Sequence, residues 1–314
     1  MPVSAEDWKP IAKGFLDRWN FPHTLGALDG KHVACKCPPG SGSEYYNYKK
    51  FYSIVLLALV DSNYKFIWAD IGGRGAASDA QVWNDSDLQD AVISGDVTFP
   101  PPDPLPNDTQ DVPYFLIGKY LFFLNFITIF KCCYLIGIHM LRNCNVCDFN
   151  HIINLFFCFF FVFSGDDAFA LRPYMQKPFG HRGLTRDERI MNYRLSRARR
   201  VVENAFGILA NRFQVLMSTM QHMPSTIRII TTTCLLLHNL MRTRYPRMQN
   251  QLLDHEDGNH NIVPGRWREG RSMRDCVSVQ GPNTANREGK KLRNLLKHWC
   301  NSEAGAVSWQ DKMI

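Results

Sequence analysis

The stretch Phe51-Tyr52-Ser53-Ile54-Val55-Leu56-Leu57-Ala58-Leu59-Val60 decides the fold, because it is almost entirely apolar and carries no charge. A run of this kind is typical of a strand buried on both faces of a sheet. Asp61-Ser62-Asn63 is a predicted turn, and residues 64–71 form a second predicted strand that ends at Gly72-Gly73. The sequence therefore predicts a covered sheet strand followed by its hairpin partner.

Another strand signal precedes this pair. Residues 24–28 lead into Asp29-Gly30, and residues 31–37 alternate before Pro38-Pro39-Gly40 breaks the pattern. We therefore expect a β-meander in which Asp29 closes the first strand. Residues 114–118, Tyr-Phe-Leu-Ile-Gly, indicate one more short strand later in the chain.

Helical patterns separate and follow these strands. Ser4-Ala5-Glu6-Asp7 resembles a capping box, which predicts a helix to about Asn20. Ser78 or Asp79 is a plausible N-cap for a short helix. Three further helices are predicted over residues 192–213, 227–245 (with Leu235, Leu236 and Leu240 facing inward) and 290–299. The order β-β-β-α-β-α predicts a mixed α/β fold.

Composition narrows the functional classes. The 314 residues are 45% hydrophobic and carry a formal charge of +7, enough for one large domain or two small ones. Residues 182–212 contain eight Arg against three acids, a local field that suits a phosphate backbone or, more simply, a solvated helix face. Residues 1–20 lack the apolar core of a signal peptide, and ten irregularly spaced Cys indicate a reducing compartment.

Four acids stand where a metal site could form: Asp29, Asp79, Asp166 and Glu203. Mg²⁺ prefers carboxylate oxygens, and two such ions can activate a water and stabilise a leaving oxygen in phosphodiester cleavage. Each acid taken alone is more simply a turn residue, an N-cap or a surface charge. Only their joint placement at strand ends and on a following helix indicates a metal centre.

Several motifs occur in the order found in PIF/Harbinger-type DDE transposases and the nucleases derived from them, and the chain resembles this family. The resemblance spans roughly residues 8–118 and 165–245. The matching motifs are Leu25-Gly26-Ala27-Leu28-Asp29-Gly30-Lys31-His32-Val33, residues 45–55, Ser78-Asp79-Ala80-Gln81-Val82-Trp83, Gly165-Asp166-Asp167-Ala168-Phe169, residues 192–207 and the closing residues 305–310.

The resemblance implies an RNase H-like mixed sheet flanked by helices and a metal-dependent DNA endonuclease or transposase activity. It implies Asp29, Asp166 and Glu203 as the catalytic triad, Asp79 as a further metal-associated carboxylate, and Mg²⁺ or Mn²⁺ as the cofactor. It further implies a nuclear protein, with the cytoplasm as a second location, whose partners are DNA and a separate Myb-like DNA-binding protein. No small-molecule substrate and no membrane attachment is expected.

The resemblance also suggests roles for the arginines of residues 182–212. Arg194, Arg197, Arg199 and Arg200 are candidates for contacts with the DNA backbone. Arg199 stands four residues before Glu203, so an ion pair within the helix is an equal alternative for it.

Residues 119–164 interrupt the pattern. They hold 11 of the 21 Phe and only four charged residues. We interpret this hydrophobic insertion as a translated intron. Codons for Gly118-Lys119-Tyr120 can contain a splice donor, those for residues 156–163 a pyrimidine tract and those for Ser164-Gly165 an acceptor, and removing residues 119–165 joins Gly118 to Asp166. A membrane segment within residues 120–163 and a zinc site from His139, Cys144, Cys147 and His151 are the alternatives.

These observations predict three regions. Residues 1–22 form an N-terminal helix left from a preceding region, residues 23–245 the DDE endonuclease domain, and residues 246–314 a polar linker and a basic tail. With the insertion present, this chain could be inactive. The competing functional class is a domesticated, non-catalytic protein that binds DNA or a partner; a membrane-anchored protein is a remote third.

Overall fold

The computed structural model describes residues 1–118, 169–180, 183–270, 272–276 and 285–314. Asp166, the hydrophobic insertion over 119–164 and its four candidate zinc ligands lie outside these residues. In the part that is described, no helix is both long and apolar enough to span a bilayer.

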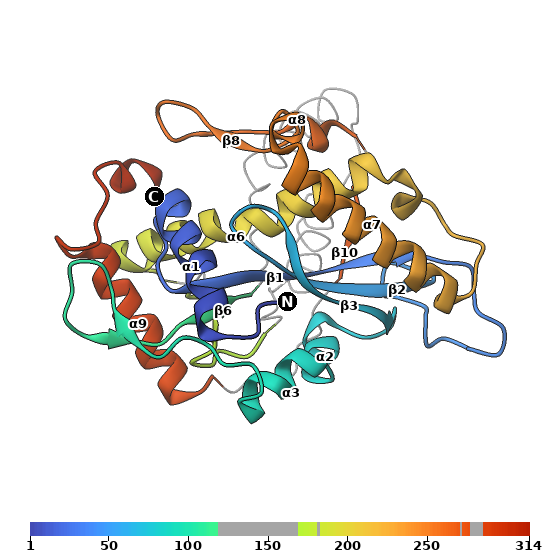
Figure 1. The fold of residues 1–314 in the computed structure, drawn as a ribbon, viewed down its shortest axis with the longest axis horizontal. Coiled ribbons are helices and arrows are strands. Elements are labelled where there is room, and N and C mark those ends of the chain that lie inside the picture. The colour runs from blue at the N-terminus through green and yellow to red at the C-terminus, as the bar shows by residue number, and fades with distance from the viewer. Residues whose placement is uncertain (119–168, 181–182, 271, 277–284) are drawn as a thin grey trace, which may run out of the picture. The chain divides into compact units, whose positions relative to one another are not determined.

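A mixed sheet forms the centre of the described chain (Figure 1). Its strand order is β3-β2-β1-β6-β7, and β10 pairs with β1 beyond the end of β6. The first three strands are antiparallel, whereas β6 runs parallel to β1 and β7 parallel to β6. This confirms the predicted α/β fold with a mixed sheet. The strands are β1 (Thr24–Ala34), β2 (Ser53–Val60), β3 (Phe66–Arg74), β6 (Phe115–Ile117), β7 (Met175–Gln176) and β10 (Arg274–Asp275).

Strand β2 is buried along its whole length, as its apolar run predicts. Ile54, Leu56 and Ala58 belong to one hydrophobic cluster, and Val55 and Leu57 belong to another. Successive side chains of a strand point to opposite faces. The sheet is therefore covered on both faces, which is why β2 needs no polar alternation.

Helices cover both faces of the sheet. Figure 1 shows α6 and α7 on one side of the sheet and α2 and α3 on the other. The Ser4 capping box and the Ser78 N-cap are both present, as predicted. The helices are α1 (Ala5–Trp19), α2 (Asp79–Asn84), α3 (Asp87–Ser94), α6 (Arg186–Arg212), α7 (Pro224–Arg244), α8 (Pro246–Asn250) and α9 (Arg287–Asn301). Two short hairpins complete the elements: β4 (Asp103–Pro104) with β5 (Asp111–Val112), and β8 (His255–Glu256) with β9 (Ile262–Val263).

Helix α6 begins six residues earlier than its apolar stripe predicts. Thr185 caps it, and Glu188 completes a capping box by accepting from the Thr185 backbone N–H at 3.0 Å. The early turns are rich in charge, so hydrophobic periodicity misses them, whereas the capping chemistry stabilises them.

The inward face of α7 differs from the prediction. Leu235 is buried, but Leu236 and Leu240 are 65% and 44% exposed. Polar side chains occupy the inward positions instead: Asn239 accepts from the Phe66 N–H at 2.9 Å and donates to the Phe66 carbonyl at 2.7 Å. These bonds satisfy backbone groups at the start of the edge strand β3, a requirement that apolar periodicity does not reveal.

Residues 246–314, predicted as a polar linker and a basic tail, include a helix that packs against α6. Helix α9 packs against α6, and its Leu292, Leu296 and Trp299 join the cluster that covers one face of the sheet. The sequence predicts a helix over residues 290–299, and the structure shows which element its apolar stripe contacts.

The two described ends that flank the hydrophobic insertion lie close together. The Gly118 N–H donates to the Gln176 carbonyl at 3.1 Å. A Cβ at Gly118 would lie 2.6 Å from Cδ2 of Phe169, so the two residues are in contact. A short connection through Asp166 could therefore join them.

Removal of residues 119–165 should yield a chain of 267 residues (314 minus 47) that keeps the sheet and is more soluble, since a large apolar segment is lost. Sequencing of transcripts across codons 110–170, together with soluble expression and circular dichroism of the shortened chain, tests this. The intron interpretation is wrong if every transcript carries the segment.

Folding stability should depend on the protonation of His238. Burial lowers the pKa of His238 from 6.5 to about 4, and its Nε2 lies 2.8 Å from the Tyr64 carbonyl. Between these two values the unfolded chain binds a proton that the folded chain excludes, so stability decreases as the pH falls from 6.5 to 4. The loss should be at most about 3 kcal/mol. Urea denaturation should show a steeper pH dependence for the wild type than for His238→Gln; equal slopes would contradict the assignment.

Candidate active site

The carboxylate of Asp29 is held in the middle of β1. Asp29 is fully buried and pairs in register with Ala58 of β2. Our prediction that Asp29 closes its strand is wrong, because the ladder with β2 carries β1 on to Ala34. The strand that ends here is the neighbour β6, whose last pair joins Ile117 to Ala27. Asp29 therefore lies just beyond the end of β6.

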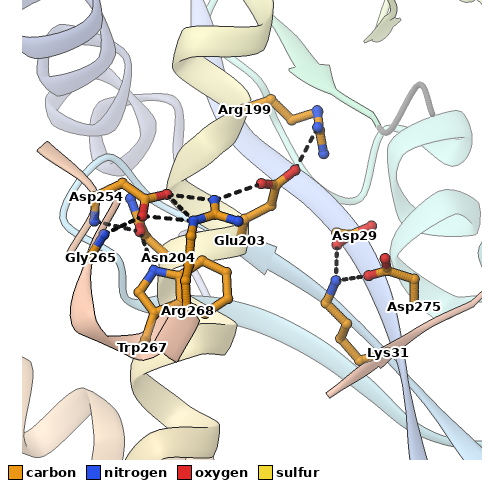
Figure 2. A network of polar contacts seen from close by, with 10 residues as sticks. All are labelled: Asp29, Lys31, Arg199, Glu203, Asn204, Asp254, Gly265, Trp267, Arg268 and Asp275. Carbon is orange, nitrogen blue, oxygen red and sulfur yellow. Dashed lines mark hydrogen bonds and ion pairs between the residues drawn. The ribbon is translucent and has the colours of Figure 1, made fainter. Parts of the chain in front are cut away.

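Lys31 shares a face of β1 with Asp29, because it lies two residues further along the strand. Its Nζ is 3.0 Å from Asp29 Oδ2 and also contacts Asp275 Oδ1 of β10 (Figure 2). Burial alone would lower the pKa of Lys31, but the carboxylates of Asp29 and Asp275 raise it above that of a free lysine. Lys31 is therefore an ammonium that forms ion pairs with both acids and balances one of their two negative charges.

Glu203 on α6 has two cationic neighbours (Figure 2). Arg199 donates to Glu203 Oε1 at 2.7 Å, which is the ion pair within the helix, one of the two roles left open for it. Arg268 reaches Oε2 at 3.5 Å. Burial would lower the pKa of Arg199, but Glu203 and then Asp29 raise it. The charges of both carboxylates therefore act on the Arg199 guanidinium. Asp29 of β1 and Glu203 of α6 thus belong to one site.

Asp79 reaches β1 from the other face of the sheet. A Cβ at Gly30 would lie 2.0 Å from Asp79 Oδ1, so the carboxylate packs directly on this glycine. Because side chains alternate along a strand, Asp79 and Asp29 approach β1 from opposite faces. Asp79 thus contacts the residue that follows Asp29 in β1. A role for Asp79 in metal binding stays a prediction.

The segment after α8 carries site residues that the sequence reasoning missed. Asp254 is buried and binds Arg268 at two points, with Nε 2.8 Å from Oδ1 and Nη2 2.6 Å from Oδ2. Gly265 donates to Asp254 Oδ1 at 2.8 Å. Asp254 therefore fixes the guanidinium that reaches Glu203.

The same segment docks on α6 through Trp267. Its Nε1 donates to Asn204 Oδ1 at 2.9 Å, and the Asp254 N–H donates to the same oxygen at 3.0 Å. A Cβ at Gly207 would lie 2.2 Å from Cδ2 of Trp267, so only glycine admits the ring. These contacts lie in the region that the sequence predicts as a polar linker. The composition of this region is polar, but Trp267 anchors it to α6. This tryptophan was the one signal in the sequence that could have indicated a packed segment.

The four arginines proposed for DNA contact are all buried. Arg194 donates to the Gly305 carbonyl at 2.5 Å and to the Asn20 carbonyl, and its guanidinium lies 5.2 Å from the Trp299 ring. With only 1% of the residue exposed, Arg194 is enclosed by its own chain and ties both ends of the chain to α6. A phosphate contact by Arg194 is therefore not supported by its geometry.

The described residues hold two members of the predicted triad, Asp29 and Glu203. No three His, Cys, Asp or Glu side chains in the described ranges are gathered so that they could hold a metal ion. Asp166, the third member, falls in the range that the structure does not describe. The oxygen chemistry of Asp29 and Glu203 suits a hard divalent cation, which would replace their contacts with Lys31 and Arg199.

A family model described as DDE superfamily endonuclease matches residues 28–109 and 138–239. These ranges contain 82 and 102 residues, which is more than half of the 314-residue chain. The chain belongs to this family. No curated protein and no solved structure matches it.

Membership of the DDE superfamily endonucleases bears directly on the site. Asp29 and Asp79 fall in the first matched range, and Asp166 and Glu203 in the second. Residues 138–164 of the hydrophobic insertion are inside the match, so the translated intron stays a hypothesis. Asp254, Arg268 and Asp275 lie outside both ranges.

Substitution of Gly30 by Ala should displace the Asp79 carboxylate. The added Cβ would lie 2.0 Å from Asp79 Oδ1, and such overpacking costs about 1–3 kcal/mol. Urea denaturation measures this loss. Gly180→Ala is the matched control, since a Cβ there meets no atom within 4 Å. Equal stabilities of the two variants would show that the Asp79 carboxylate is not packed against Gly30 of β1.

Proposed function

We propose that this DDE superfamily endonuclease cleaves phosphodiester bonds of DNA in a reaction that depends on Mg²⁺ or Mn²⁺. The observation that carries the proposal is that Asp29 from β1 and Glu203 from α6, each in an ion pair, lie close enough for the charges of both carboxylates to act on Arg199. Carboxylates from different elements have to converge in this way to hold ions for cleavage by a two-metal mechanism.

Each residue of the site has a distinct task in this proposal. Divalent ions, when bound, would supply an activated water and stabilise the leaving oxygen. Asp29 offers a carboxylate fixed by the β1–β2 ladder, and Glu203 one that Arg268 orients. Lys31 and Arg199 neutralise these acids in the metal-free chain and provide positive charge beside the incoming phosphate.

Further parts of the proposal rest on the family resemblance. Asp166 would complete the triad, and Asp79 would support the metal centre from the α2 side. A PIF/Harbinger origin, a Myb-like DNA-binding partner and a nuclear location belong to the same proposal.

One observation favours a second candidate, a domesticated protein that binds DNA or a partner without cutting. Asp29 and Glu203 each have an internal cation: Lys31 for the first, and Arg199 with Arg268 for the second. These internal cations compete with added metal ions for the two carboxylates.

Asp29→Asn, Asp166→Asn and Glu203→Gln should each abolish Mg²⁺-dependent nicking of supercoiled DNA while the fold is retained. Each change removes a negative ligand but keeps the shape of the side chain. Loss of 10²-fold or more is expected, on the order of 3 kcal/mol in the activation barrier. Glu303→Gln, at an exposed acid away from the site, is the control. Nicking that survives all three substitutions refutes the enzyme assignment.

A metal titration separates the two candidates. The nuclease should nick DNA only after Mg²⁺ or Mn²⁺ is added and stop with chelator. A protein that binds DNA equally with and without these ions, and never nicks it, is the non-catalytic form.

A further inference from the structure

A cavity of about 520 Å³ lies beside α6, less than one helical turn before Glu203. Its walls come from the end of α1, the β2–β3 turn, α6, the end of α7 and residues 246–256. A volume of this size is in the range of ligand-binding sites. The cavity is separate from the Asp29–Lys31–Asp275 contacts, and Asp254 connects it to Arg268 and thus to Glu203.

The lining of the cavity is rich in positive charge. It contains four guanidinium groups and two carboxylates, Asp254 and Glu256. Asp254 is bound at two points by Arg268, and Glu256 accepts from Arg197 Nε at 2.6 Å and from Nη2 at 2.9 Å. Both acids are therefore already paired. The four guanidinium groups belong to Arg18, Arg197, Arg200 and Arg242.

Two of these arginines are fixed by their own contacts. Besides Glu256, Arg197 lies 5.6 Å from the ring centroid of Trp19 and 4.9 Å from that of Trp309. Arg242 donates to two backbone carbonyls, those of Asn63 at 3.2 Å and Pro246 at 3.1 Å. These side chains build the wall and have few donors left for a ligand.

The other two arginines have only long polar contacts with the residues that the structure describes. Arg200 is 8% exposed, and its one ion pair with a described residue joins Nη1 to Glu256 Oε1 at 3.5 Å. Arg18 donates to the Ser62 carbonyl, also at 3.5 Å. Good bonds of a guanidinium to an anion are about 2.7–2.9 Å long. Burial holds the pKa of Arg200 below that of a solvated arginine, so its charge is poorly compensated.

We propose that this cavity binds a phosphate group through the guanidinium groups of Arg18 and Arg200. The planar fork of a guanidinium matches two phosphate oxygens, and a buried, weakly paired arginine gains most from such a ligand. The phosphate belongs either to a DNA strand that passes the active site or to a small phosphorylated ligand. Only the first source rests on the proposed nuclease function.

Isothermal titration of the full chain with inorganic phosphate tests the site. The wild type should bind phosphate, and Arg18→Gln and Arg200→Gln should each weaken binding about tenfold or more, the loss expected for a charged hydrogen bond. Arg18 is exposed, so its variant keeps the test valid if the Arg200 variant fails to fold. Arg228→Gln, an exposed arginine on α7 outside the cavity lining, is the control and should bind as the wild type does.

A second measurement identifies the source of the phosphate. Fluorescence anisotropy with a DNA duplex at several salt concentrations should give a slope of log K against log[salt] that is smaller by about one in each cavity variant. A smaller slope assigns the cavity to the DNA backbone. An unchanged slope together with lost phosphate binding assigns it to a small phosphorylated ligand.

The proposal is overturned if the wild type does not bind phosphate, or if both cavity variants bind it as the control does. These results can be read whether or not the chain nicks DNA. Failure of the nuclease function and failure of the phosphate site are thus separate outcomes.

Discussion

Charge that is buried between α6 and β1 has to be neutralised inside the chain, because an isolated ion in a protein interior is strongly destabilising. Asp29 is fully buried, and Arg194, Arg197, Arg199 and Arg200 on α6 are nearly so. The contacts of this layer follow from that requirement. Lys31 neutralises Asp29, Arg199 neutralises Glu203, and Glu256 binds Arg197.

The C-terminal region takes part in these ion pairs. Asp254, Arg268 and Asp275 come from residues outside the family match, yet they hold Glu203 and Lys31. The matched core supplies Asp29 and Glu203 together with Lys31 and Arg199, and the later segment adds one more cation, Arg268, and two more acids, Asp254 and Asp275. A divalent cation would enter a site whose acids are already in ion pairs, so its binding has to compete with these contacts.

Some elements could be predicted because local chemistry specifies them. The apolar run of β2, the capping box at Ser4, the N-cap at Ser78 and the apolar stripe of α6 each appear in the structure. The elements that were missed depend on long-range partners. The inward face of α7 is polar because Asn239 bonds to the start of β3, and the polar segment around Asp254 is ordered because Trp267 fits against Gly207.

By itself, the sequence determined the central strands β1, β2, β3 and β6, the longer helices and the mixed α/β fold, and it named Asp29 and Glu203 among four candidate acids. Periodicity and motif spacing are properties of neighbouring residues, so they can be recognised without a structure. Only the tertiary structure decided that Asp29 lies within β1 rather than at its end, and that Lys31 and Arg268 hold the acids. The contact between Lys31 and Asp275 spans 244 positions, and no local pattern encodes a pairing at that separation.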